Sequence, residues 1–175
     1  MDQEIVSTRI VVPDDLSMVA LLGSRDELLR VIETALVSDV HVRGNEITIT
    51  GTAADNAIAT RLFDALLALL AKGQPLSTDA VERSLAMLVG GGNERPADVL
   101  TLNIVSNRGR TIRPKTVNQK RYVEAIDEHT VVFAIGPAGT GKTYLAMAKA
   151  VQALQAKQVN RIILTRPAVE AGERL

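Results

Sequence analysis

The sequence contains no cysteine and only two histidines, His41 and His129. The missing cysteines exclude disulfides and cysteine-ligated metal, and two histidines are too few for a histidine zinc site. No apolar run approaches the roughly 20 residues that a membrane-spanning helix needs. The chain opens with Met1-Asp2-Gln3-Glu4, which is acidic where a signal peptide would be basic. These absences predict a cytoplasmic protein.

The formal net charge is zero, but the two halves of the chain differ in sign. Residues 1–92 hold 7 lysines and arginines against 13 acidic residues, and residues 93–175 hold 13 against 7. Such a split predicts two units with different partners. Gly90-Gly91-Gly92-Asn93, a helix stop followed by flexible chain, indicates the boundary. A chain of 175 residues can form one substantial domain or two small ones.

The first unit has the pattern of a small α+β module. A capping box at Ser24-Arg25-Asp26-Glu27 predicts a helix start, and Gly44-Asn45 between two alternating runs predicts a hairpin turn. The expected elements are a strand at 5–12, a helix from Ser24, hairpin strands at 40–43 and 46–50, and helices at 53–71 and from Thr78. This order is compatible with a KH-like RNA-binding fold.

A KH domain clamps nucleic acid with a G-x-x-G loop. Here Gly23-Ser24-Arg25-Asp26 has aspartate in the last position, which places a negative charge where a phosphate would lie. The acidic balance of the unit also disfavours RNA binding. RNA binding and a structural or protein-contact role both stay open for this module.

A phosphate-binding loop is the most informative motif of the chain. Gly136-Pro137-Ala138-Gly139-Thr140-Gly141-Lys142-Thr143 fits G-x-x-x-x-G-K-[ST] at every fixed position. The apolar run 131–135 before it predicts a buried parallel strand, and 144–157 predicts a helix. We expect the glycines at 136, 139 and 141 to turn the backbone with positive φ, so that N–H groups form an anion nest. Lys142 would reach the β- and γ-phosphates of ATP, and Thr143 would ligate Mg²⁺.

A basic segment lies before the loop. Arg108, Arg110, Arg113, Lys115, Lys120 and Arg121 occur within 14 residues, with no acidic residue among them. Residues 118–126 predict a short helix, and its Gln119 is a candidate for selecting ATP over GTP, because an amide can read adenine through N6 and N7. The alternative is an exposed basic linker, but a basic cluster beside an anion site favours nucleotide-base and nucleic-acid contact.

Three motifs together resemble the PhoH-like family of P-loop ATPases, whose core is similar to superfamily 1 helicases. They are Arg113-Pro114-Lys115-Thr116-x-x-Gln119-x-x-Tyr122, the phosphate-binding loop, and Leu164-Thr165-Arg166-Pro167-Ala168-Val169-Glu170-Ala171-Gly172-Glu173. The resemblance is strong over 110–175 and weak over the first unit, where such proteins often carry a KH-like domain.

This resemblance implies ATP binding and hydrolysis, an RNA-linked role, a ring-shaped oligomer and association with an rRNA-maturing endoribonuclease of the YbeY type. By motif position it assigns adenine recognition to Gln119. It also assigns a contact with nucleic acid or with the neighbouring core to Arg166.

The sequence departs from a complete P-loop ATPase after the loop. Such an enzyme needs an acidic residue at the end of a later core strand, but the candidate strand 161–164 ends in Thr165-Arg166. The helicase-like motif with a distal arginine is absent as well. We therefore expect weak nucleotide binding, very slow turnover and an exposed apolar sheet edge near 161–164. The end at Leu175, in mid-motif, indicates a truncated gene product or a cut piece.

The expected fold is therefore α/β, with a KH-like module at 1–92, a basic linker at 93–117 and a partial parallel-sheet P-loop core at 118–175. The predicted nucleotide site consists of Gln119, Gly136, Pro137, Ala138, Gly139, Thr140, Gly141, Lys142, Thr143 and Tyr144, with catalytic roles for Lys142 and Thr143. The predicted nucleic-acid contacts are Arg108, Arg110, Arg113, Lys115 and Arg166. The alternatives to an ATPase portion are a non-catalytic nucleotide- or RNA-binding module and, less favoured, a P-loop kinase.

Overall fold

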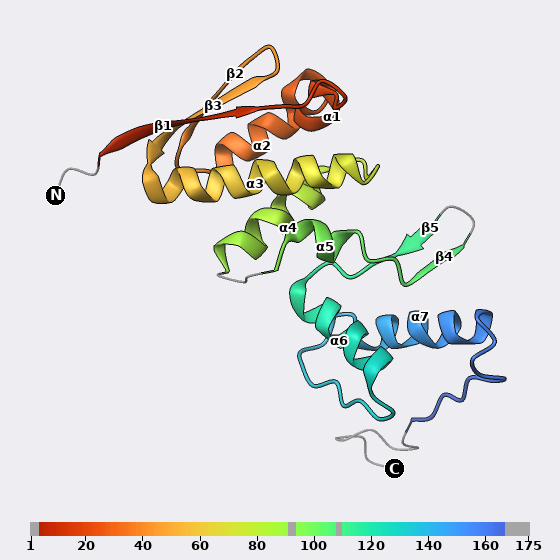
Figure 1. Ribbon diagram of the computed structural model, residues 1–175. Coiled ribbons are helices and arrows are strands. Elements are labelled where there is room, and N and C mark those ends of the chain that lie inside the picture. Colours follow the sequence, from red (N-terminus) through yellow and green to blue (C-terminus); the bar gives the residue numbers. More distant parts are fainter. Residues whose placement is uncertain (1–3, 91–93, 108–109, 167–175) are drawn as a thin grey trace.

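The computed structural model describes residues 4–90, 94–107 and 110–166. Its elements in chain order are β1 (Ile5–Val11), α1 (Met18–Leu22), the 3₁₀ turn η1 (Ser24–Asp26), α2 (Glu27–Ala35), β2 (Asp39–Arg43), β3 (Glu46–Thr52), α3 (Ala53–Ala71), α4 (Thr78–Val89), α5 (Pro96–Leu100), β4 (Val105–Asn107), β5 (Arg110–Ile112), α6 (Val117–Glu128) and α7 (Lys142–Gln155). They gather around two apolar cores, one formed by β1 to α5 and a smaller one by β4 to α7 (Figure 1).

The first part is a three-stranded antiparallel sheet with helices on one side. The strand order is β1-β3-β2, and pairs such as Ile10 with Ile47 and Val40 with Ile49 fix the register. Alternation turns these four side chains to one face of the sheet, where they are buried. The helices α2 and α3 lie along one side of the sheet (Figure 1). The predicted hairpin is confirmed, and Gly44 supplies positive φ at the first position of its two-residue turn.

The buried Asn56 of α3 joins this helix to the sheet. Its amide donates to the carbonyl oxygens of Val6 at 2.9 Å and Ile49 at 3.3 Å, and its own oxygen accepts from the Ser38 hydroxyl at 2.8 Å. Gly51 leaves room for these groups, because a Cβ there would lie 2.6 Å from Ser38 Oγ. Since each buried polar atom has a partner, this polar cluster fixes how α3 lies against β1 and β3.

The predicted capping box at Ser24 is wrong. Residues 24–26 form η1, with φ near +60° at Arg25 and Asp26, and α2 begins at Glu27 without a side-chain cap from Asp26. A helix that the sequence pattern missed, α1, precedes this turn and is capped by the Ser17 hydroxyl. Burial of Leu21, Leu22 and Leu28 on either side of the turn outweighs the local capping preference. The Gly23–Asp26 loop therefore connects two helices.

The segment predicted as a basic linker contains secondary structure. Within it, α5 packs on the first core through Ala97 and Leu100, and β4 and β5 form an antiparallel hairpin. The predicted helices around 118–126 and 144–157 are confirmed as α6 and α7. These two helices are joined by an ion pair between Lys149 Nζ and Asp127 Oδ1 at 2.5 Å. The division of the chain into units at 1–92, 93–117 and 118–175 stays a prediction.

The two parallel strands predicted at 131–135 and 161–164 do not form. Both segments form neither a helix nor a strand, and Phe133 and Ile135 are 87% and 98% exposed. A central parallel strand is stabilised only by neighbours on both sides, and the strands of the described ranges pair in the two antiparallel sheets alone. The helices and the two small sheets of the described residues nevertheless confirm the mixed α/β class. Ile163 and Leu164 are exposed as expected, but not as the edge of a sheet.

Among residues 4–90, 94–107 and 110–166, no helix is both long and apolar enough to cross a bilayer.

Candidate functional site

The phosphate-binding loop leads directly into α7, as its sequence predicts. Gly139 and Gly141 have φ of +78° and +85°, and Gly141 is the residue that precedes the first helical residue, Lys142. An L-residue would be strained at either glycine. The expected positive φ at Gly136 is wrong, since this glycine is absent from the left-handed region. Two of the three glycines therefore produce the turn into the helix.

Lys142 folds back over the loop. Its ammonium donates to the carbonyl oxygens of Gly136 at 2.8 Å and Pro137 at 2.6 Å, and to the Thr140 hydroxyl oxygen at 3.2 Å. The Thr140 hydroxyl in turn donates to Pro137 O at 2.9 Å. The lysine is thus held over the loop by oxygens of the loop itself. Thr143 is exposed in the first turn of α7.

Gln119 of α6 contacts the phosphate-binding loop. Its Nε2 donates to the Thr140 carbonyl oxygen at 3.1 Å, and its Oε1 accepts from the backbone N–H of Lys115 at 2.7 Å. The Thr116 hydroxyl caps α6 by accepting from the Gln119 N–H at 3.2 Å. Close approach to the loop also needs Gly141, because a Cβ there would lie 3.2 Å from Gln119 Nε2. The side chain therefore joins the basic segment to the loop in one fixed orientation.

A cavity of about 540 Å³ lies where α6, the segment 132–137 and the loop meet. This volume is within the range of small-molecule sites. It is lined by Thr116, Asn118, Gln119, Arg121, Tyr122, Ala125, Val132, Phe133, Ala134, Ile135, Gly136, Pro137, Thr140, Lys142 and Leu145. Of the predicted nucleotide-site residues, Ala138, Gly139, Gly141, Thr143 and Tyr144 do not line it, and the Tyr144 side chain is 62% exposed.

Ten of the fifteen described lining residues lie outside the predicted nucleotide site, among them Phe133, Asn118 and Tyr122. Phe133 was expected in a buried strand, whereas Asn118 and Tyr122 flank Gln119 in the motif and could have been included on that signal. The described lining residues combine one ammonium and one guanidinium with aromatic and aliphatic side chains, and none of them is a carboxylate. They can therefore hold an anion that carries an apolar ring, but none of them is an acidic group that could activate water.

Of the predicted nucleic-acid residues, Arg113 and Lys115 line one cavity of about 230 Å³. Arg113 donates through Nε to the Asn103 side-chain oxygen at 2.6 Å, and Lys115 is exposed between β5 and α6. Arg166 is exposed at the end of the described range. Arg110 begins β5, and Arg108 lies outside the described residues.

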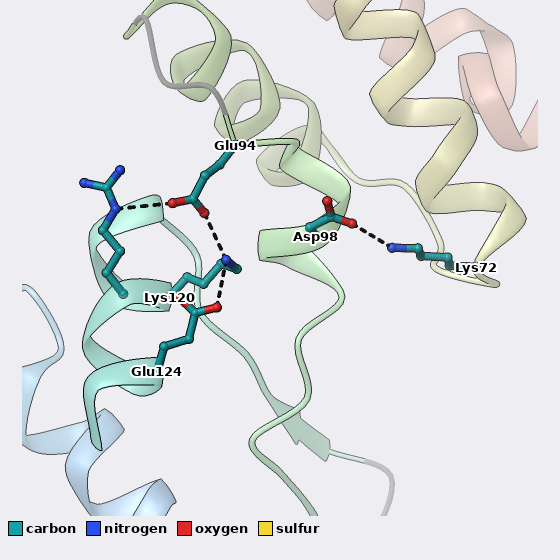
Figure 2. A network of polar contacts seen from close by, with 6 residues as sticks. Lys72, Glu94, Asp98, Lys120 and Glu124 are labelled. Atoms are coloured by element: carbon teal, nitrogen blue, oxygen red, sulfur yellow. Dashed lines mark hydrogen bonds and ion pairs between the residues drawn. The ribbon is translucent and has the colours of Figure 1, made fainter. Parts of the chain in front are cut away.

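Two cations of the basic segment are paired with carboxylates (Figure 2). Glu94, which precedes α5, accepts from Arg121 Nε at 3.2 Å and forms an ion pair with Lys120 Nζ at 3.2 Å, and Lys120 also pairs with Glu124 at 2.8 Å. Desolvation alone would raise the pKa of Glu94, but the hydrogen bonds and charges of Lys120 and Arg121 outweigh it and hold that pKa below its ordinary value. The hydrogen bond to Glu124 is the main reason that the pKa of Lys120 is raised. This network attaches α6 to the first part of the chain.

Comparison with known proteins connects this site to a family. The family model described as PhoH-like protein matches residues 111–175, which include Gln119, the phosphate-binding loop and α7. A PhoH-like protein of Mycobacterium tuberculosis (strain ATCC 25618 / H37Rv) is 66% identical over 170 residues, which are 97% of this chain and 48% of that protein. The chain belongs to the PhoH-like family.

Other PhoH-like relatives differ in how much of this chain they match. The PhoH-like protein of Bacillus subtilis (strain 168) is 42% identical over 164 residues, 93% of this chain and 51% of its own length. Protein PhoH of Escherichia coli (strain K12) is 49% identical over 57 residues, 33% of this chain and 16% of its own length. The chain thus spans about half the length of the curated PhoH-like relatives that match it nearly throughout. A search of solved structures finds no significant match.

Proposed function

We propose that this PhoH-like chain binds ATP with Mg²⁺ and that the complete protein hydrolyses ATP in RNA metabolism. The observation that carries the proposal is the contact between Gln119 and the phosphate-binding loop on the wall of one cavity. A base-reading amide and a phosphate cradle thereby belong to the same site.

The fixed orientation of Gln119 favours adenine over guanine. An amide has two N–H donors and an oxygen with two lone pairs, and the two tethers use one donor and one lone pair. One donor and one lone pair remain, which are what adenine N7 and the adenine N6 amino group require. Guanine presents acceptors at both N7 and O6, so the remaining lone pair would face another acceptor.

The residues at the loop fit a triphosphate with its metal. The Lys142 ammonium already lies among loop oxygens, and Thr143 in the first turn of α7 supplies the hydroxyl that would hold Mg²⁺. When bound, Mg²⁺ would neutralise charge on the phosphates. Lys142 would exchange the carbonyl oxygens of Gly136 and Pro137 for phosphate oxygens.

The first part of the chain supports the proposed link to RNA. Its order of strand, two helices, hairpin and helix is compatible with a KH-like fold, and Gly23–Asp26 lies between two helices. Asp26 places a negative charge in that loop, so a structural or protein-contact role remains the alternative for this module. A ring-shaped oligomer and a YbeY-type partner are proposals for the complete protein.

The second candidate function is a nucleotide-binding module without catalysis. It is favoured by the absence of any carboxylate from the described cavity lining, since water activation in P-loop ATPases needs an acidic group that also positions Mg²⁺. For this chain by itself we expect ATP binding with negligible turnover.

A titration of the chain with a fluorescent ATP analogue in the presence of Mg²⁺ tests the proposal. Lys142→Ala should lower affinity at least about tenfold, because a charge-assisted contact with phosphate is lost. Arg30→Ala is a matched control, since it removes one exposed cation from α2, far from the loop in sequence and outside the cavity lining. Equal affinities of the three proteins would refute ATP binding at this loop. Steady-state turnover abolished by Lys142→Ala would refute the non-catalytic alternative.

A further inference from the structure

A second cavity separates α4 from the start of α6. Its volume is about 470 Å³, and it is lined by Arg83, Ala86, Met87 and Gly90 on one side and by Lys115, Thr116, Val117, Asn118 and Arg121 on the other. Three lining residues are cations, and none of the described lining residues is acidic. The side chains of Met87 and Val117 add apolar surface. We call this cavity the α4–α6 cleft.

We propose that single-stranded RNA binds in the α4–α6 cleft, with its phosphates at Arg83 and Lys115 and a base against Met87 and Val117. This inference rests on the proposed link to RNA and locates it away from the Gly23–Asp26 loop. A positively charged groove with surfaces for exposed bases is the usual arrangement for binding single strands.

Arg83 is held in position for such a contact. Asp79, one turn earlier on α4, accepts from Arg83 Nε at 2.8 Å and from Nη2 at 2.7 Å. The guanidinium has five N–H donors, so three remain after this bidentate pair. Its side chain is 31% exposed, which allows a phosphate to reach those donors. The carboxylate therefore orients the guanidinium while phosphate-binding capacity remains.

Lys115 supplies the second cation from the opposite wall. Its side chain is exposed, and its positive charge is one of the causes that lower the pKa of Asp79. Arg121 and Arg83 are each paired with a carboxylate, Glu94 and Asp79 respectively, so part of each charge is already neutralised. The affinity should therefore depend most on Lys115, and next on Arg83, which keeps three N–H donors for a phosphate.

The α4–α6 cleft continues in both directions, which fits a strand better than an isolated nucleotide. Arg83 and Lys115 also line a smaller cavity of about 230 Å³, together with Arg113 and the carboxylate of Asp79. On the other side, Thr116, Asn118 and Arg121 are shared with the nucleotide cavity. The lining of the cleft has no aromatic ring among the described residues, so contact with the backbone should dominate and sequence preference should be weak.

The test is the affinity of this chain for a fluorescein-labelled oligouridylate, measured by anisotropy between about 50 and about 200 mM salt. Arg83→Ala and Lys115→Ala should each weaken binding about tenfold, which corresponds to one charge-assisted contact. Each should also reduce the slope of log affinity against log salt by about 0.7, the value for one phosphate of a single strand. Arg30→Ala should change neither quantity.

Asp79→Asn separates phosphate binding from the structural effect of the ion pair. It removes the same ion pair as Arg83→Ala but keeps the guanidinium and an amide oxygen that can still accept from Arg83 Nε and orient it. Its affinity for RNA should therefore equal or exceed that of the wild type. A loss as large as that of Arg83→Ala would overturn the proposed role of Arg83. As a second measurement, RNA with 4-thiouridine should cross-link to peptides that contain residues 83–90 or 115–121, and cross-links confined to other peptides would overturn the site.

The remaining outcomes distinguish this inference from the functions proposed above. Salt-dependent RNA binding that neither cleft variant weakens would refute the cleft and leave the RNA link standing. No RNA binding by the wild type would refute both, while the ATP proposal has its own titration. If polyglutamate binds as tightly as RNA and the same variants weaken it, the ligand is an acidic protein segment and the RNA proposal is overturned.

Discussion

Replacement of Gln119 by alanine should remove selection for ATP without abolishing phosphate binding. The two tethers of the side chain, to Thr140 O and to the Lys115 N–H, leave one N–H and one lone pair for a base. If both tethers persist when ATP binds, they contribute equally to the free and bound states and largely cancel in the affinity. The bidentate contact with adenine is then what Gln119→Ala removes, and such pairs contribute about 1–3 kcal/mol of discrimination.

We therefore expect the affinity of Gln119→Ala for ATP to fall about tenfold and its affinity for GTP to stay nearly constant. Gln119→Glu is the matched variant, because it keeps the Oε1 acceptor but turns a second oxygen toward Thr140 O and toward adenine N7. It should weaken ATP binding further and still reject GTP. Competition titrations with ATP and with GTP in the presence of Mg²⁺ measure the affinity of each variant for each nucleotide relative to the wild type. Equal weakening of ATP and GTP by Gln119→Ala would show that Gln119 only tethers the loop and would refute base reading.

Two further predictions concern the loop and the network around α6. Gly139→Ala should destabilise the chain by about 1–2 kcal/mol, because alanine is strained at φ near +80°, and should also weaken ATP binding. Gly73→Ala is the matched control, because Gly73 has φ +71° and, like Gly139, has open space where a Cβ would lie. In urea denaturation it should lose as much stability as Gly139→Ala, and its affinity for ATP should stay unchanged. Similar losses of ATP affinity in the two variants would contradict a special role of the loop glycine. Glu94 has a lowered pKa, so its pairing stabilises the fold above the ordinary glutamate pKa of 4.5 and is lost as the pH falls through the lowered value. The melting temperature of Glu94→Gln should therefore lie below that of the wild type at neutral pH and converge with it in acid, and a gap that persists in acid would refute this role.

Patterns stabilised by contacts close in sequence predicted the structure well. The hairpin around Gly44 and the helices α3, α4, α6 and α7 follow from turn chemistry and from apolar spacing alone. The capping pattern at Ser24 failed because Leu21 and Leu22 are buried on a short preceding helix, which sets where the turn falls. Local preference is weak against tertiary burial of this kind.

Features that depend on distant partners could not be predicted. The apolar run 131–135 has the composition of a buried strand, but strand formation needs paired neighbours that periodicity does not report. The contact of Gln119 with Thr140 spans 21 residues. The sequence could indicate only that the two residues belong to motifs of the same family. Glu94 lies outside the basic segment, so its pairing with Lys120 and Arg121 was invisible in a local count of charges.

The position of Lys142 means that the phosphate-binding loop contains a competitor for its own ligand. The carbonyl oxygens of Gly136 and Pro137 hold the ammonium through an intramolecular interaction, which acts like a high local concentration of acceptors. Any incoming anion gains only the difference between its own attraction for the lysine and that of these oxygens. A single phosphate gains little from this exchange, whereas a magnesium triphosphate offers several oxygens at once. Under the proposed function, loss of the terminal phosphate would let the loop recapture the lysine, and this recapture would favour release of the shorter product.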